Sequence, residues 1–181
     1  MELAKIDNNF KDKEKLYAVN DEAFPNEERI PSDRIINFCL NLNCDFWGIY
    51  DEKEFAGFIV ILPNKELKIA YICFLAIDSK YRSKGLGAKT LQEVSKKYSE
   101  FQLVLDLERI DENAKNIEQR KRRLAFYERN GYRRTNFGMT YFGVDYEILF
   151  NGTKFNSDNF RTLMNSIKLE KFNVKIYSIK D

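Results

Sequence analysis

A short basic segment with two closely spaced glycines is the part of this sequence best suited to chemistry. It reads Arg82-Ser83-Lys84-Gly85-Leu86-Gly87-Ala88-Lys89 and follows an apolar run that ends at Ile77. Glycines let a main chain approach a large anion closely, and the free N–H groups in the first turn of a helix attract negative charge. The basic side chains of Arg82, Lys84 and Lys89 would add positive charge there. The segment therefore indicates a diphosphate site, although an ordinary solvated turn would show the same residues.

Other phosphate-binding motifs fit this segment less well. A P-loop aligned on Lys89-Thr90 would need glycines where the sequence has Ser83 and Ala88. A dinucleotide-binding turn would need a third glycine at position 90, which is threonine, although Asp106 lies at a suitable distance for a ribose contact. A nucleotide-binding protein therefore stays a remote alternative.

The sequence contains no histidine, so proton transfer must use other groups. Ser-His and Cys-His catalysis and histidine zinc sites are excluded, and we expect no metal. The cysteines Cys39, Cys44 and Cys73 lack CxxC spacing, which indicates reduced apolar side chains in a cytoplasmic protein. Cys73 lies in a continuous apolar run, which favours an inert thiol over an acyl-carrying nucleophile.

The charge of the chain is nearly balanced, with a formal net charge of +2. This balance argues against wholesale binding of nucleic acid, and the basic run Gln119–Arg123 is more typical of a solvated helix face than of an RNA contact. No apolar segment approaches the length that spans a membrane, and the N-terminal residues lack an apolar signal core. We therefore expect neither nucleic acid nor membrane as a partner.

The elements that would position these residues alternate between strand and helix patterns, which predicts one mixed α/β domain. The expected strands are 2–6, 45–50, 55–62, 69–77, 102–107, 132–135, 140–150 and 172–179. The expected helices are 11–24, one beginning after Ser32, 86–98, one that ends near Asn130-Gly131, and one carrying Phe160, Leu163, Met164 and Ile167. The glycine segment thus lies between a buried strand and an amphipathic helix.

Two motifs in this order resemble a known family. The segment Arg82–Ala88 is similar to the Arg/Gln-x-x-Gly-x-Gly/Ala acyl-CoA signature of the GNAT superfamily of N-acetyltransferases. The segment Ala125-Phe126-Tyr127-Glu128-Arg129-Asn130-Gly131-Tyr132 is similar to the family's Phe-Tyr-x-x-x-Gly-Phe/Tyr helix end. The order of elements over residues 1–150 also agrees with that fold.

The resemblance implies a single mixed, mostly antiparallel central sheet flanked by helices. Residues 1–150 would form the acetyltransferase domain, and residues 151–181 a helix-strand extension of it. The resemblance also implies acetyl-CoA as co-substrate, with main-chain groups near the end of the apolar strand pairing with the pantetheine amides. The implied cofactor-binding residues are Leu75, Ala76, Ile77, Arg82, Ser83, Lys84, Gly85, Leu86, Gly87, Ala88 and Lys89.

Amine acylation needs a neutral amine and a proton for the departing thiolate. Tyr127 matches the family's tyrosine near the cofactor sulfur and is the expected general acid. Glu108 and Glu28 are the expected alternatives for the base, and each is also a typical surface carboxylate. The loop that carries Phe24, Glu28 and Arg29 is the expected substrate-binding loop, with an ordinary solvated loop as its alternative.

The sequence departs from the family where many relatives carry Asn and Ala, because Arg120 and Arg123 stand at those positions. The usual asparagine contact to the cofactor would then fall to Asn113 or Asn116. A non-catalytic acyl-CoA-binding sensor is therefore the alternative function. The expected acceptor is a small-molecule amine or a protein amino group. Residues 151–181 would cover the sheet edge, pair with a second subunit in a homodimer, or shape the acceptor pocket.

Overall fold

The computed structural model describes residues 1–7, 10–23, 39, 42–168 and 172–179. Its strands form one mixed sheet in the order β1-β2-β3-β4-β5-β7-β6-β8, which confirms the expected fold class. The pairs β1–β2, β2–β3, β5–β7, β6–β7 and β6–β8 are antiparallel. The chain divides into two compact units, Met1–Pro63 with Ile72–Lys97, and Asn64–Tyr71 with Tyr98–Asp181.

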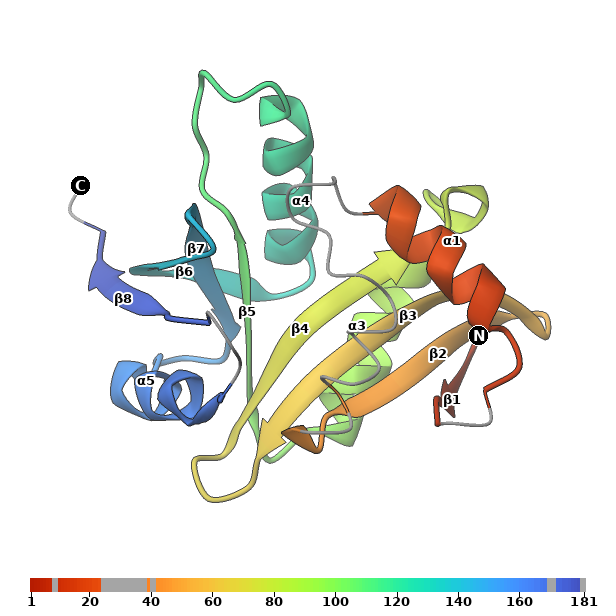
Figure 1. Cartoon of the computed structure of the whole chain (residues 1–181), viewed down its shortest axis with the longest axis horizontal. Helices are drawn as coiled ribbons and strands as arrows, with labels where there is room; N and C mark the ends of the chain where they lie inside the picture. Colours follow the sequence, from red (N-terminus) through yellow and green to blue (C-terminus); the bar gives the residue numbers. More distant parts are fainter. Residues whose placement is uncertain (8–9, 24–38, 40–41, 169–171, 180–181) are drawn as a thin grey trace. The chain divides into compact units, whose positions relative to one another are not determined.

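The first unit holds the N-terminal strands, with α1 drawn in front of them and α3 behind (Figure 1). Its elements are β1 Glu2–Lys5, α1 Lys13–Ala23, β2 Asp45–Asp51, β3 Glu54–Asn64, β4 Ile69–Ile77, the 3-10 turn η1 Ser79–Tyr81 and α3 Leu86–Lys97. The last residue of β3, Asn64, and the first part of β4, up to Tyr71, belong to the second unit. Leu16 and Val19 of α1 pack in one core cluster with Phe46 and Phe58 of the strands. Burial of this apolar surface is what fixes α1 on the sheet.

Helix α3 follows the glycine segment directly and is amphipathic. Its buried residues Leu86, Thr90, Leu91 and Val94 recur at helical spacing on one face. The Thr90 hydroxyl donates to the Leu86 carbonyl at 2.9 Å, so this buried polar group is satisfied within the helix. The apolar face of α3 therefore holds the first turn, and the glycine segment before it, in a fixed place in this unit.

The second unit holds the C-terminal strands and two helices (Figure 1). Its elements are β5 Gln102–Glu108, α4 Ile117–Arg129, β6 Tyr132–Tyr141, β7 Val144–Asn151, α5 Ser157–Ser166 and β8 Lys175–Ser178. Gly131 has φ 86° and so ends α4 in the left-handed cap expected from the sequence. β8 pairs with β6 through Met139 and Ile176, which places the C-terminal extension at the end of the strand order.

The single strand expected over residues 140–150 is wrong. The chain reverses at Phe142 and Gly143, whose φ values are 49° and 79°, so that Tyr141 pairs with Val144 in a two-residue hairpin. Such hairpins require positive φ at both central residues, and they usually carry Asn-Gly or Asp-Gly. Phenylalanine in the first position hid the turn, because an aromatic residue there is typical of a continuing strand.

Candidate active site

The glycine segment leaves the end of β4 as a tight turn. Ser83 and Gly85 have φ values of 62° and 76°, and α3 begins at the next residue, Leu86. Within the described part of the chain, no group accepts a hydrogen bond from the backbone N–H groups of residues 83–88. When residues of positive φ alternate with ordinary residues before a helix N-terminus, successive backbone N–H groups point into one concave site. Such a site suits an anion. The diphosphate site expected from the sequence at this turn stays a prediction.

The Arg82 side chain is tied to the strand that precedes the turn. Its Nε donates to the carbonyl of Ile77 at 2.8 Å, and its guanidinium lies 3.2 Å from the Glu22 carboxylate of α1. The Lys84 ammonium lies 5.3 Å from the centre of the Tyr81 ring. Both positive charges are thus held beside the turn. The Ile77 carbonyl, expected to pair with pantetheine, keeps one lone pair beyond its bond to Arg82.

The end of β4 lies unusually close to β3. A Cβ atom added to Gly57 would stand 2.2 Å from the carbonyl oxygen of Ala76. Glycine is therefore required at position 57 because the two backbones approach too closely for any side chain. Leu75 and Ile77 on either side of Ala76 are half-buried. Sequence reasoning did not single out Gly57, although a glycine inside an apolar strand is a typical sign of close backbone approach.

Tyr127 lies on α4 and its ring packs between two other aromatic rings. The ring centres of Phe126 and Tyr132 are 5.1 and 5.6 Å away. Burial raises the pKa of the Tyr127 phenol to about 12, the charge of Arg123 lowers it, and the charge of Asp106 raises it. Among the described residues, none forms a hydrogen bond with the Tyr127 hydroxyl. The phenol therefore keeps its proton near neutral pH and has no protein acceptor for it.

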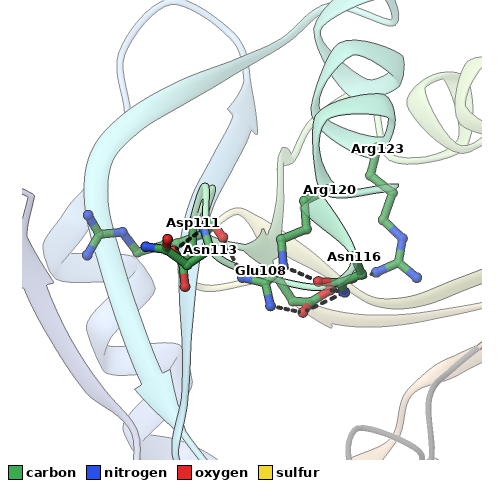
Figure 2. A network of polar contacts seen from close by, with 7 residues as sticks. Glu108, Asp111, Asn113, Asn116, Arg120 and Arg123 are labelled. Carbon is green, nitrogen blue, oxygen red and sulfur yellow. Dashed lines mark hydrogen bonds and ion pairs between the residues drawn. The ribbon is translucent and has the colours of Figure 1, made fainter. Parts of the chain in front are cut away.

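Glu108, at the end of β5, is the centre of a buried polar network (Figure 2). Its two carboxylate oxygens lie 2.6 Å from the Arg120 guanidinium and 3.2 Å from that of Arg123, and both accept from the Asn116 side-chain amide at 3.2 Å. Arg120 also donates to the Asn116 side-chain oxygen at 2.8 Å and to the Arg109 carbonyl at 2.7 Å. Only 3% of the Glu108 side chain is exposed. The network joins β5 to α4.

The two arginines that depart from the family pattern therefore have a structural partner in this protein. Arg120 and Arg123 both face Glu108 from successive turns of α4 (Figure 2). Asn116 is engaged in the same network, whereas the backbone N–H of Asn113 donates to the Asp111 side chain at 2.9 Å. Sequence reasoning placed these residues in a charged helix face and did not predict that they would converge on Glu108.

Asp106 is a second carboxylate in the same strand, with different neighbours. It accepts a short hydrogen bond from the Tyr71 hydroxyl and one of 2.8 Å from the Tyr141 hydroxyl. Burial raises the pKa of Asp106 to about 6, although both phenols act to lower it. In the described residues, no lysine or arginine forms an ion pair with Asp106. Sequence reasoning considered this residue only for a ribose contact, although a carboxylate between the apolar residues Leu105 and Leu107 was a usable signal.

Three expected site residues, Phe24, Glu28 and Arg29, lie outside the described residues. Lys89 lies in the first turns of α3, where its backbone N–H donates to Gly85. Cys39 is buried, and Cys44 and Cys73 are half-buried and unbonded to one another. Hydrogen bonds from the thiols of Cys39 and Cys73 lower the pKa of the Cys44 thiol.

No described helix is both long and apolar enough to cross a membrane. Within the same residues no cluster of cysteine, aspartate and glutamate could hold a metal ion.

Comparison with known proteins gives one family. The model of the Acetyltransferase (GNAT) family matches residues 13–132. No curated protein sequence matches the chain.

Several solved structures share the fold. An aminoglycoside 6'-N-acetyltransferase in complex with coenzyme A is 17% identical, with a TM-score of 0.65 over 83% of this chain and 96% of that one. The ribosomal-protein-S18-alanine N-acetyltransferase of Escherichia coli is 16% identical, with a TM-score of 0.63 over 87% and 97%. The PaiA N-acetyltransferase of Thermoplasma acidophilum, in complex with coenzyme A, is 18% identical, with a TM-score of 0.62 over 84% and 98%.

Proposed function

This chain belongs to the GNAT family of acetyltransferases, and we propose that it transfers the acetyl group of acetyl-CoA directly to a primary amine. In this proposal the turn from Arg82 to Ala88 binds the pyrophosphate. The unused N–H groups of residues 83–88 and the charges of Arg82 and Lys84 support that assignment. The end of β4 would supply main-chain contacts to the pantetheine, and the half-buried Leu75 and Ile77 at that strand end support this assignment.

We assign the general acid to Tyr127, and the observation that carries this assignment is a half-buried phenol whose proton no described residue accepts. The Tyr132 hydroxyl also lacks a partner, but that residue is buried. The raised pKa keeps the proton on Tyr127 at neutral pH, so the residue is ready to give a proton and not to take one. A leaving thiolate is the group in amine acylation that needs this proton.

The acceptor class is a primary amine on a small molecule or a protein. Two structural neighbours act on nitrogen, as their names state: one modifies an aminoglycoside, and the other an alanine of a ribosomal protein. At 17% and 16% identity, these neighbours support the fold of this chain and do not select between the two kinds of acceptor.

The test compares Tyr127→Phe with Tyr132→Phe. The Tyr132 hydroxyl is buried without a hydrogen-bond partner, so its removal is a matched control in which one aromatic hydroxyl is lost beside the same rings. With acetyl-CoA and a panel of primary amines, Tyr127→Phe should lower kcat by about 100-fold or more and leave the Kd for CoA nearly unchanged. Tyr132→Phe should keep wild-type turnover.

Each outcome has a distinct meaning. Unchanged turnover in Tyr127→Phe would refute the assignment of the acid. Thermal stabilisation by CoA without thiol release on any amine would favour the alternative of an acyl-CoA sensor. Absence of both effects would refute the binding of CoA itself.

A further inference from the structure

The strand β5 presents two carboxylates whose surroundings differ in one decisive respect. Glu108 has both oxygens bound by cationic guanidinium groups and an amide. Asp106, two residues earlier on the same face of the strand, has both oxygens bound by neutral phenols, those of Tyr71 and Tyr141. A carboxylate that has only neutral neighbours is not neutralised by a counter-charge. Asp106 can therefore attract a cationic ligand, whereas the charge of Glu108 is already neutralised by two guanidinium groups.

The neighbours of Asp106 come from several elements and include the expected acid. Tyr71 lies on β4 and Tyr141 on β6. The charge of Asp106 also acts on the Tyr127 phenol of α4, and Tyr146 of β7 stacks on Tyr141 with ring centres 4.2 Å apart.

The cation that acts on Tyr127 is already engaged. The positive charge that acts on Tyr127 belongs to Arg123, which is ion-paired with Glu108. Asp106 itself is half-buried as a residue, and each carboxylate oxygen accepts from one phenol.

We propose that Asp106 is the catalytic base of this chain, and that it receives the ammonium group of the acceptor between the Tyr71 and Tyr141 phenols. This inference rests on the proposed acetyl transfer to an amine. It replaces the sequence-based candidates for the base with a residue that sequence reasoning did not consider for that role. Glu108 becomes a positioning residue, which holds α4 and therefore Tyr127 through Arg120 and Arg123.

The proposed proton transfers balance. The acceptor ammonium gives one proton to the Asp106 carboxylate, and the neutral nitrogen attacks the acetyl carbon. The carbon–nitrogen bond forms and the carbon–sulfur bond breaks as Tyr127 gives its phenolic proton to the sulfur. A second proton leaves the nitrogen and restores the phenol, and Asp106 releases its proton to water. The net products are the N-acetylated amine, the free thiol and one proton.

The acidity of Asp106 fits this role. Burial raises its pKa to about 6, so the carboxylate is ionised at neutral pH and yet accepts a proton more readily than an ordinary aspartate. The Tyr71 and Tyr141 hydroxyls oppose the shift by donating to the charged form. They therefore set the pH at which the base becomes active.

The first experiment needs no turnover. We would label aspartate Cγ with carbon-13, identify the Asp106 resonance by its loss in Asp106→Asn, and titrate the free protein by NMR with and without n-butylammonium chloride. We expect Asp106 to titrate near pH 6 and the added cation to lower its pKa. A resonance that does not titrate between pH 5 and 7.5, or that ignores butylammonium, would overturn the inference even if the enzyme proves to be an acetyltransferase.

The second experiment uses the pH dependence of kcat with an amine that the wild type acetylates. The acid limb should lie near pH 6, and Asp106→Asn should lose this limb and about 100-fold or more in kcat. Tyr141→Phe should move the limb to higher pH, because the carboxylate loses a donor. Asp158→Asn on the exposed start of α5 is the matched control and should match the wild type.

The kinetic result separates this inference from the proposed function. An Asp106→Asn enzyme with kcat within threefold of the wild type and an unmoved limb would refute the base and leave the transferase intact. If no amine is acetylated, the proposed function fails, and the NMR titration alone decides whether Asp106 is an ammonium-binding carboxylate.

Discussion

The network around Glu108 makes a strong prediction about the stability of this protein. In Glu108→Gln the side chain keeps its shape but loses its charge, and the new NH2 group meets the donors of Asn116 and Arg123. Two guanidinium groups would then remain in a largely buried site without their counter-ion. We expect the variant to unfold at a lower temperature than the wild type.

The magnitude follows from burial. Removal of one partner from a buried ion pair costs about 3–5 kcal/mol. The lower end applies here, because Arg120 and Arg123 are 17% and 29% exposed and water can rehydrate them in part. About 3 kcal/mol corresponds to a fall in Tm of roughly 6–12 °C for a domain of this length.

The assay is thermal unfolding followed by circular dichroism, with Glu112→Gln as the matched control. Glu112, in the loop before α4, pairs with Lys121 of α4 at 2.9 Å, but the two side chains are 72% and 44% exposed, so water screens the pair. We expect no measurable change in Tm for this control. Equal shifts of Tm in the two variants, or a decrease in Tm of less than 2 °C in Glu108→Gln, would refute the reasoning that burial makes the Glu108 network strong.

Two further predictions concern the strands. Gly57→Ala should weaken CoA binding at least tenfold in calorimetry and lower Tm, because its Cβ would stand 2.2 Å from the Ala76 carbonyl, and unchanged binding would show that β4 shifts freely. Because burial raises the pKa of Asp106 from 3.8 to about 6, the folded protein binds more protons than the unfolded chain between these values, so stability falls as pH rises from about 4 to 6. In urea unfolding, the free energy of unfolding of Asp106→Asn should therefore exceed that of the wild type by up to about 3 kcal/mol at pH 7.5, and the two should be equal at pH 4. A difference that does not change with pH would contradict this.

Local sequence signals predicted most of the fold, because the determining interactions lie close together in the chain. The apolar run Ile69–Ile77 is β4 as expected, and the helix after the glycines begins at Leu86. Gly131 adopts the left-handed cap that its position after α4 indicated. The hairpin at Phe142 was not predicted, because its turn requires positive φ and a phenylalanine does not indicate that conformation.

The polar part of the candidate site could not be predicted in the same way. Glu108 and Arg120 lie twelve positions apart, and their contact depends on how α4 crosses the end of β5. Asp106 acquires its phenols from β4 and β6, each 35 residues away. Charge periodicity describes which face of a helix is polar but carries no information about which carboxylate that face meets. Long-range pairing of polar groups therefore had to come from the structure.

Helix α4 differs from α3 in how it is held, since α3 buries four residues and α4 fully buries none. A helix fixed in part through ions responds to the chemical nature of a denaturant as well as to its strength. Guanidinium chloride carries the same planar cation as Arg120 and Arg123, so it competes with them for Glu108 while it also screens charge. Urea has no charge and leaves that competition out. Guanidinium chloride therefore weakens the ion pairs that hold α4 even before unfolding, whereas urea leaves them intact. Variants that differ in the attachment of α4 should be compared by their unfolding midpoints in urea.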